Sequence, residues 1–265
     1  MNKSILKNTN PSINWYHEVL SALTNDRTDF VLEIEDDYVF IKNDGLIINL
    51  LDLGNNFLPA DLIKLQEHYS VKNIKLIHLW EDVWFNRKDQ VLARLKSIFG
   101  YNTKIHGRQT KIEKLSKPIA ETFLNVNHLQ GYVSSRYKLG LFFKGELVAV
   151  ATFSALRKMN HSENYKSVEL IRFAVKAGYS VIGGLSKLIS SFRDLQKPND
   201  IMTYADRDWS AGEAYIKLGF EFTDGLAPQT FNLDENFNRK LRKETDEKND
   251  PVIYNTGSLK YLLRF

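Results

Sequence analysis

Apolar and polar residues along the first hundred positions repeat in patterns typical of alternating helices and strands. WYHEVLSALTN and LPADLIKLQEHYSVKN have the apolar spacing of amphipathic helices. Between them, VLEIEDDYVFIKNDGLIINLLDL predicts two or three strands, with a hairpin turn at Asn43-Asp44-Gly45. IKLIHLWEDVWF then predicts a buried strand that leads into a final helix ending near Gly100. This order predicts a small α/β domain.

The remaining residues show a different order of elements. KLGLFFKGELVAVATFSA predicts a hairpin turning at Lys144-Gly145, and SVELIRFAVK predicts a long strand. GYSVIGGLSKLISSFRDL predicts a glycine-containing turn that opens a helix, DIMTYAD a strand, and WSAGEAYIKLGF a further helix. FEFTDG and VIYNTGSLKYLLRF add strands. We therefore expect an α/β (α+β) protein with two domains.

Composition and charge refine this division. The segment YNTKIHGRQTKIEKLSKP is rich in basic residues and precedes a new helix cap at Ser116, which places the boundary between domains 1–103 and 104–265. Residues 1–100 hold 11 Lys+Arg against 14 Asp+Glu, and the rest of the chain holds 25 against 18, a net charge of +7. A polyanion such as DNA is expected to prefer this C-terminal part. The basic segment itself is either a solvated linker or a phosphate-facing strip.

The residue types exclude several kinds of site. The chain has no cysteine, which excludes disulfides and thiolate chemistry and suits a reducing cytoplasm. No apolar run reaches the roughly 20 residues of a membrane span, and MNKSILKNTNPS lacks a signal-peptide core. The histidines show no metal-binding spacing. We expect a cytoplasmic protein without a membrane partner or a metal.

The segment NIKLIHLWEDVWFNRKDQVLARLKSIFG resembles the closing strand and helix of endonuclease-like domains related to very-short-patch-repair enzymes and some phage homing endonucleases. The resemblance extends more weakly over residues 12–100. It implies a magnesium site made of clustered carboxylates, for which Glu18 and Asp37 are candidates. Asn49, however, stands where the family has a Glu, and an amide cannot supply that charge. The resemblance therefore implies a degenerate domain kept for docking or DNA contact.

Over residues 108–265 the order of elements resembles GNAT acyltransferases. In that family a glycine-rich turn at a helix N-terminus holds the pyrophosphate of coenzyme A. Here GYSVIGGLSKLI has Gly183 in the matching position, but Ser180 and Leu185 depart from the usual pattern. The resemblance implies acetyl-CoA or a related acyl-CoA as cofactor, or alternatively a turn that holds no ligand. The cofactor-binding candidates are Ser180, Val181, Gly183, Gly184 and Ser186.

The resemblance also implies catalytic residues. DWSAGEAYIKLGF fits the GNAT pattern that ends in Tyr-x-x-x-Gly-Phe, so Tyr215 is the candidate general acid toward the departing thiolate, or alternatively a packing residue. Glu169 and Asp206, on neighbouring predicted strands, are the candidate bases. Regular alternation puts Glu169 and Arg172 on opposite faces of their strand, so only one of them is expected to face the acceptor.

A narrower resemblance concerns the acceptor. NHLQG, ELIRF, GGLSKL and YADRDWS together resemble phage-associated GNAT-like proteins and, more distantly, the phage Mom DNA-modification protein. This resemblance implies acyl transfer to a DNA base in a host cytoplasm. The substrate-binding candidates are His128, Arg172, Tyr204, Arg207 and Trp209. Two alternatives stay open: a GNAT acting on a small amine or protein, and a non-catalytic nucleic-acid-binding or virion-associated protein.

Overall fold

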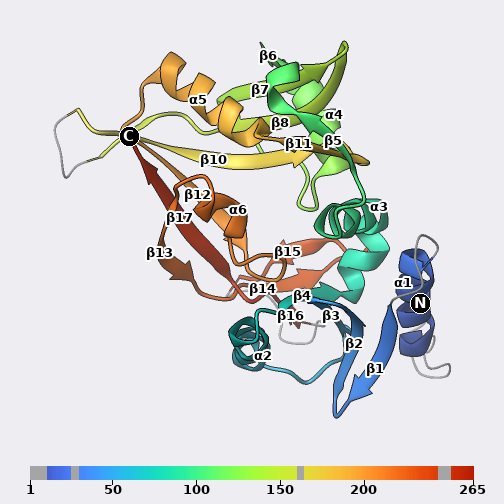
Figure 1. The fold of residues 1–265 in the computed structure, drawn as a ribbon. Coiled ribbons are helices and arrows are strands. Elements are labelled where there is room, and N and C mark those ends of the chain that lie inside the picture. Colours follow the sequence, from blue (N-terminus) through green and yellow to red (C-terminus); the bar gives the residue numbers. More distant parts are fainter. Residues whose placement is uncertain (1–10, 25–29, 160–163, 244–251) are drawn as a thin grey trace. The chain divides into compact units, whose positions relative to one another are not determined.

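The computed structural model describes residues 11–24, 30–159, 164–243 and 252–265 as a mixture of helices and mixed sheets (Figure 1). Contacts within the chain define two units. Unit 1 comprises residues 1–88, 206–210 and 227–258, and unit 2 comprises 89–205, 211–226 and 259–265. Unit 1 therefore includes two segments that come from far beyond residue 103 in the sequence.

Unit 1 is built on a four-stranded sheet in the order β1-β2-β3-β4. Strands β1, β2 and β3 are antiparallel, and β4 lies parallel to β3 because α2 connects them. Its elements, in chain order, are α1 (Pro11–Thr24), β1 (Val31–Glu35), β2 (Tyr38–Asn43), β3 (Leu46–Leu51), α2 (Pro59–Val71) and β4 (Lys75–Trp80). The hairpin predicted at residues 43–45 is the β2–β3 turn, where Gly45 has φ +79°.

Unit 1 also contains a three-stranded sheet from the C-terminal part of the chain. It consists of β14 (Thr230–Leu233), β15 (Arg239–Leu241) and β16 (Val252–Tyr254) in the order β15-β14-β16. Ile253 of β16 is fully buried in one cluster with Leu51, Leu62 and Trp80 of the N-terminal elements. Burial of these side chains joins the two sheets into one core.

Helix α3 (Glu81–Ile98) follows β4 directly and has a non-helical residue at Arg87, close to residue 88, where unit 1 gives way to unit 2. No helix in the described part of the chain is long and apolar enough to cross a membrane.

Unit 2 is built on an eight-stranded mixed sheet, in which seven strands follow the order β13-β17-β12-β10-β8-β7-β6 and β9 pairs with β10. Unit 2 includes the last turns of α3. Its other elements in the first half are β5 (Thr103–His106), the 3₁₀ helix η1 (Gly107–Gln109), β6 (Lys111–Lys114), α4 (Lys117–Asn127), β7 (Tyr137–Phe143), β8 (Glu146–Phe153) and β9 (Arg157–Lys158). They are followed by β10 (Lys166–Val175), β11 (Tyr179–Ile182), α5 (Gly184–Gln196), β12 (Asp200–Asp206), α6 (Glu213–Ile216), β13 (Glu221–Leu226) and β17 (Ser258–Arg264). The predicted hairpin at Lys144-Gly145 is the β7–β8 turn, where both residues have positive φ.

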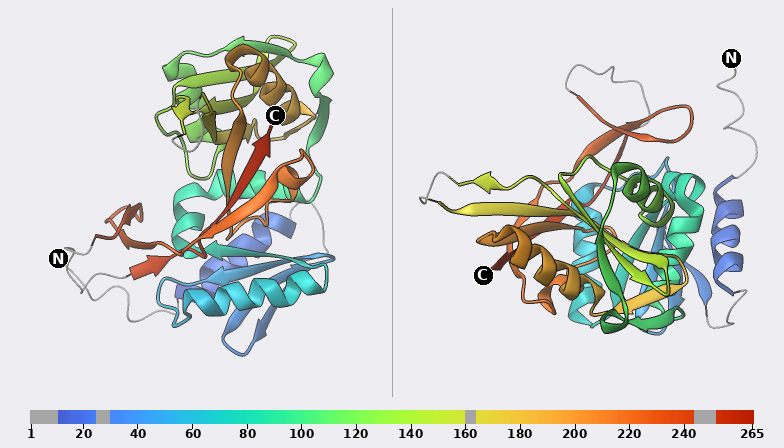
Figure 2. Two further views of the ribbon diagram at one scale, coloured as in Figure 1. Left: turned by 90° about the vertical axis from the view of Figure 1, so that its left-hand side faces the viewer. Right: turned by 90° about the horizontal axis from the view of Figure 1, so that it is seen from above.

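Helices cover both faces of this sheet (Figure 2). The α5 face carries the larger core, in which Leu188, Ile189 and Phe192 of α5 pack on the strands. The α4 face carries a smaller core made by Ala120, Phe123 and Leu124 of α4 with Val150 and Ala174 of the sheet. A group on this sheet can therefore be assigned to the α5 face or the α4 face from its neighbours.

The helix predicted from WSAGEAYIKLGF is much shorter than expected. Only Glu213–Ile216 is helical, because Gly212 before it has φ +78° and forms the N-cap. A Cβ at Gly212 would lie 2.2 Å from the ring of Tyr261, so the tight approach also requires glycine. The residues before Gly212 are consequently not helical, although the sequence pattern predicts that they form the first turn of this helix.

Candidate functional site

The central feature of unit 2 is the separation of two parallel strands. β10 and β12 pair from Ser167/Asp200 to Leu170/Thr203, and no pairing continues beyond. β10 nevertheless runs on to Val175 and β12 to Asp206, and Figure 1 shows them diverging from their shared end. Backbone groups of both strands beyond Leu170 and Thr203 are therefore not used for pairing between these strands. Ligands of α/β folds bind outside the carboxyl ends of parallel strands.

A β-bulge marks the point of separation. The pairing of β10 with β8 shifts register between Leu170 and Arg172, so Ile171 is the extra residue. Before the bulge Val168 and Leu170 point to the α5 face, and after it Phe173 does so while Ala174 points to the α4 face. Glu169 and Arg172 therefore share the α4 face. The expectation that they lie on opposite faces was wrong, because it assumed a regular strand.

The candidate cofactor-binding residues surround the start of α5. Ser180 and Val181 lie on β11, which pairs in parallel with β5, and Ser186 is exposed in the first turn of the helix. Gly183 is the N-cap with φ +70°, and nothing lies within 4 Å of a Cβ built on it. Gly184 is buried, and a Cβ there would lie 2.8 Å from Val181. The first backbone N–H groups of this helix thus begin at an open, exposed turn.

A second segment holds this turn in place. Gly107 of η1 lies so close to this turn that a Cβ built on it would be 3.0–3.1 Å from backbone atoms of Ile182 and Gly183. Lys187 of α5 donates to the Gly107 carbonyl at 3.0 Å and also to the Thr110 carbonyl. Because the lysine is used for these bonds, it fixes the turn and is not available for a bound phosphate.

The candidate general acid Tyr215 lies on α6 and packs against the core of the α5 face. Its ring lies 5.5 Å from the ring of Phe220 and 5.8 Å from that of Tyr261. Among the described residues, none forms a hydrogen bond with the Tyr215 hydroxyl. The neighbouring Tyr261 differs, because its hydroxyl donates to the Ala211 carbonyl at 2.5 Å. Tyr215 therefore has a ring fixed by packing and a hydroxyl that is not used for structure.

The candidate acceptor residue His128 follows α4 as its C-cap. Its Nδ1 accepts a hydrogen bond from the backbone N–H of Gln130 at 3.1 Å, so the ring proton lies on Nε2. Burial, together with the smaller effects of Arg172 and Arg94, lowers the pKa of His128 to about 3. The imidazole is therefore neutral and a poor proton acceptor at pH 7.

The other acceptor candidates separate into two groups. By alternation from the buried Thr203 and Ala205, Tyr204 lies on the same face of the sheet as Glu169. Arg207, in contrast, pairs with Glu67 at 3.0 Å, and its carbonyl accepts a bond from Gln66. Trp209, another substrate-binding candidate, is only 5% exposed, so its ring is not available to a substrate. Both residues belong to the fold of unit 1.

Asp206, the second candidate base, ends β12. Its Oδ1 accepts the backbone N–H of Asp208 at 3.1 Å, and its carbonyl accepts from Trp209 and Ser210. The Asp208 carbonyl in turn accepts the backbone N–H of His78 at 2.9 Å. Asp206 therefore initiates a turn that attaches this segment to β4, and Glu169 is the better placed of the two candidate bases.

In unit 1, the position expected to hold a catalytic Glu is a buried amide. Asn49 on β3 lies opposite His78 on β4, and its Nδ2 donates to His78 Nδ1 at 3.1 Å. His78 Nε2 donates to the Leu62 carbonyl at 3.1 Å, and burial lowers the pKa of His78 to about 3. The pair is neutral and fully enclosed, as in a polar core contact.

Most of the carboxylates in unit 1 that could bind a metal form structural hydrogen bonds or ion pairs instead. Asp52 accepts Trp15 Nε1 at 2.8 Å and the Tyr16 hydroxyl, while Glu81 accepts the backbone N–H of Leu53. Burial raises the pKa of Glu81, and Asp52 adds to this. Glu18 pairs with Lys88, and Asp37 is exposed in the β1–β2 turn. In the described part of the chain, no three Asp, Glu or His side chains are grouped to hold a metal.

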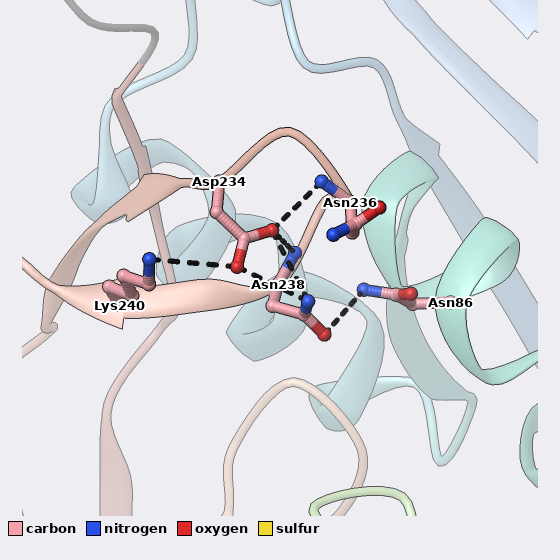
Figure 3. Close-up of polar contacts among 5 residues, drawn as sticks. All are labelled: Asn86, Asp234, Asn236, Asn238 and Lys240. Carbon is pink, nitrogen blue, oxygen red and sulfur yellow. Dashed lines mark hydrogen bonds and ion pairs between the residues drawn. The ribbon is translucent and has the colours of Figure 1, made fainter.

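A polar turn of unit 1 joins β14 to β15 (Figure 3). Asp234 Oδ1 accepts the backbone N–H groups of Asn236 and Asn238 at 2.9 Å, and Asn238 also bonds to Asn86 at 3.3 Å. These bonds lower the pKa of Asp234. Lys240 lies 3.7 Å from its other oxygen. The carboxylate is thus committed to holding the turn, although its Asp-x-Asn-x-Asn spacing is one that calcium loops also use.

Comparison with known proteins gives likenesses among solved structures only. No family model matches the chain, and no curated protein matches it. An acetyltransferase from Bacillus subtilis in complex with CoA is 15% identical, with a TM-score of 0.39, over 59% of this chain and 99% of that one. A GNAT family acetyltransferase from Elizabethkingia anophelis with acetyl-CoA bound gives the same values. The ribosomal-protein-S18-alanine N-acetyltransferase from Escherichia coli is 16% identical, with a TM-score of 0.37, over 58% and 93%.

Proposed function

We propose that this protein is an acyltransferase that takes an acyl group from acetyl-CoA or a related acyl-CoA. The observation that carries the proposal is the separation of β10 from β12 at the Ile171 bulge, in the unit where α5 begins at an open turn. Because α5 lies between the parallel strands β10 and β12 in the chain, we infer that its N-terminus lies toward the carboxyl end of both strands. The open backbone edges and the helix N-terminus therefore meet at the same end of the sheet.

The residues at the start of α5 fit the phosphates of such a donor. Backbone N–H groups of a first helical turn, together with the helix dipole, attract a pyrophosphate. Gly183 leaves the turn open, and Ser186 adds an exposed hydroxyl. Gly107 packs against the backbone of the turn, and Lys187 fixes Gly107 by donating a hydrogen bond to its carbonyl. The donor supplies an acyl group activated as a thioester, and the separated strands provide unpaired backbone groups to align it.

The two faces of the sheet would serve the two reactants. Tyr215 lies on the α5 face and Glu169 on the α4 face. Glu169 would accept the proton of the acceptor nucleophile, directly or through water, as its bond to the acyl carbon forms. Tyr215 would donate a proton to the sulfur as the carbon–sulfur bond breaks. Each proton is then accounted for, and no metal enters the scheme.

For the acceptor, we propose DNA as the first class to test, in the cytoplasm of a host if a phage encodes the protein. The net charge of +7 beyond residue 100 supports this choice. The proposal of DNA does not depend on Arg207 or Trp209, because Arg207 is paired with Glu67 and Trp209 is buried. A small amine or a protein amine is the alternative acceptor.

For unit 1, we propose a non-cleaving role in docking or DNA contact. The neutral Asn49–His78 pair occupies the position where a nuclease of the resembling kind has a charged ligand. DNA binding without magnesium-dependent cleavage by the intact protein would support this role, and cleavage that requires magnesium would contradict it.

The donor assignment is tested by thermal denaturation with and without acetyl-CoA. A ligand present at about 100 times its Kd stabilises the folded protein by about 2.7 kcal/mol, which raises Tm measurably. Gly183→Asp should abolish the shift, because a carboxylate at this turn repels phosphate. Gly145→Asp is the matched control, since Gly145 also has positive φ and open surroundings, but lies in the β7–β8 turn. A missing shift in the wild type, or a shift that survives Gly183→Asp, would contradict the proposal.

A further inference from the structure

Two short paired segments at the amino end of β10 carry positive charge on both strands. β9 runs antiparallel to the start of β10, and Lys158 lies directly opposite Lys166. The pairing extends beyond β9, since the backbone N–H of Met159 donates to the Tyr165 carbonyl at 2.9 Å. Figure 2 shows these segments extending outward from the sheet. We name this pair the basic ribbon, which consists of residues 157–159 and 165–167.

The direct opposition of two lysines in the basic ribbon is unfavourable for the fold by itself. Like charges that face each other on paired strands repel. The side chains of Lys158 and Lys166 are exposed, and no carboxylate of the described residues forms an ion pair with either. An anion bound between the two ammonium groups would remove this repulsion. The pairing therefore matches a negatively charged partner.

Two further cations lie beside this pair. Arg157 is exposed on β9 and lies opposite Ser167. Lys197, the C-cap of α5, is exposed two residues before Asn199. Asn199 is bonded to Lys166 twice, because its Oδ1 accepts the backbone N–H of Lys166 and its own N–H donates to the Lys166 carbonyl, both at 2.8 Å. Neither Arg157 nor Lys197 forms an ion pair in the part of the chain that the structure describes, so four positive charges gather at this end of the sheet.

The carboxylates at this end of the sheet are used within the fold. Asp200 is only 5% exposed and accepts a hydroxyl of β10 at 2.5 Å. Asp194 pairs with Arg193 and Glu221 pairs with Arg264, so each pair contributes no net charge. The four cations of the basic ribbon and the α5 C-cap therefore give this surface its positive sign.

The position of the basic ribbon relates it to both proposed reactants. The 13 residues of α5 separate Lys197 from the open turn at Gly183 by about 20 Å. Ser167, opposite Arg157, shares a face of β10 with Glu169, which lies two residues further on, about 7 Å away. A polyanion bound by the ribbon would therefore lie near the candidate base and far from the phosphates of the donor.

We propose that the basic ribbon and Lys197 bind the phosphates of duplex DNA. The inference rests on the proposed acyltransferase function and names the surface that would present a DNA acceptor. DNA is favoured over other anions because its major groove admits a two-stranded ribbon and its closely spaced phosphates can contact all four cations. Phosphate contacts position a protein without reading sequence, so this binding is expected to be the same for different sequences.

The test measures binding of the full-length protein to a short fluorescent duplex by anisotropy, at salt concentrations from about 50 to 200 mM. Each phosphate contact contributes about 0.9 to the slope of log affinity against log salt. Lys158→Gln combined with Lys166→Gln should therefore reduce this slope by about 1.8, and weaken binding equally for duplexes of different sequence. The variant removes a repulsion, so its Tm, measured in parallel, should not fall.

Lys111→Gln combined with Lys114→Gln is the matched control. It removes the same charge from two exposed lysines of β6, the edge strand at the other side of β7 and β8, and should leave the slope unchanged. Saturating acetyl-CoA should not displace the duplex, because the donor turn and the basic ribbon lie at opposite ends of α5. Displacement would show that the duplex binds at the donor turn instead.

The remaining outcomes separate the inference from the proposed function. An unchanged slope in the ribbon variant, or binding to phosphatidylserine vesicles without binding to the duplex, would overturn the inference. A protein whose Tm rises with acetyl-CoA but that binds no duplex contradicts the inference and leaves the donor assignment in place. A protein that binds the duplex through the ribbon, with no rise in Tm on addition of acetyl-CoA, contradicts the proposed function.

Discussion

Replacing Tyr215 with Phe should separate catalysis from folding. The tyrosine ring packs between Phe220 and Tyr261, and Phe keeps that packing. The hydroxyl forms no hydrogen bond within the described residues, so its removal should leave the free energy of unfolding unchanged. If the hydroxyl protonates the leaving sulfur, its loss should lower kcat by about 100-fold or more, the usual contribution of a positioned acid.

Tyr261→Phe is the matched comparison. Tyr261 is 2% exposed, and its hydroxyl donates to the Ala211 carbonyl at 2.5 Å. Removing this bond leaves a carbonyl without its partner and should cost about 1 kcal/mol of stability, which lowers Tm by about 2–4 °C. The residue is not expected to exchange a proton with the donor, so kcat should change little. The two variants should therefore give opposite results in the two assays.

Transfer is measured as thiol released from acetyl-CoA with DNA or an amine as acceptor. The protein has no cysteine, so a thiol reagent gives no background from the chain itself. Affinity for acetyl-CoA, taken from the thermal shift, should be equal in the wild type and Tyr215→Phe. A Tyr215→Phe protein with wild-type kcat would refute the role of the hydroxyl. A protein with lowered Tm would show that the hydroxyl is structural.

Three further predictions concern stability. Burial lowers the pKa of His78 to about 3, below the ordinary 6.5, so its stabilising effect is full above pH 6.5 and declines by about 2 kcal/mol between pH 7 and 5. Because the pKa of His128 is also lowered to about 3, His78→Gln should reduce the acid-dependent loss of stability in chemical denaturation by about 2 kcal/mol and leave the contribution of His128. Thr152→Val should raise the free energy of unfolding by about 1 kcal/mol, because it removes a buried hydroxyl that forms no hydrogen bond with the described residues. A decrease of the free energy of unfolding by the same amount would contradict this prediction. Asp82→Asn should lower it by about 3 kcal/mol, since Asp82 forms a two-bond ion pair with Arg239, and combining it with Arg239→Met should recover part of that loss.

Local patterns in the sequence predicted the elements well and their irregularities poorly. The hairpins at Gly45 and Gly145 follow from turn residues that require positive φ, and both were confirmed. The bulge at Ile171 has no comparable signal, since isoleucine is an ordinary strand residue and the register shift depends on β8. Its effect is large, because one extra residue moves Arg172 to the other face. Tertiary pairing therefore determined which candidate residues share a face.

The acceptor candidates failed for a related reason. Trp209 and Arg207 follow a strand of unit 2 in the sequence, which made them resemble residues beside its carboxyl end. In the structure the chain leaves unit 2 after Ala205, and Asp208 is buried in unit 1. Its Oδ1 accepts both the N–H and the hydroxyl of Thr256, at 3.0 and 2.6 Å. Proximity in sequence to the candidate site is thus no guide to the role of this segment.

The same contacts explain why unit 1 cannot be regarded as a separable N-terminal module. Its core needs Ile253, its buried Asp82 needs Arg239, and β4 uses the Asp208 carbonyl for the N–H of His78. Without the two later segments, an N-terminal fragment would leave a buried carboxylate and a strand N–H without partners, at a cost comparable to the total stability of a small domain. The polypeptide therefore passes from unit 1 to unit 2 and back before unit 1 is complete. Unit 1 therefore cannot complete its core until the chain has been synthesised through unit 2 as far as Ile253.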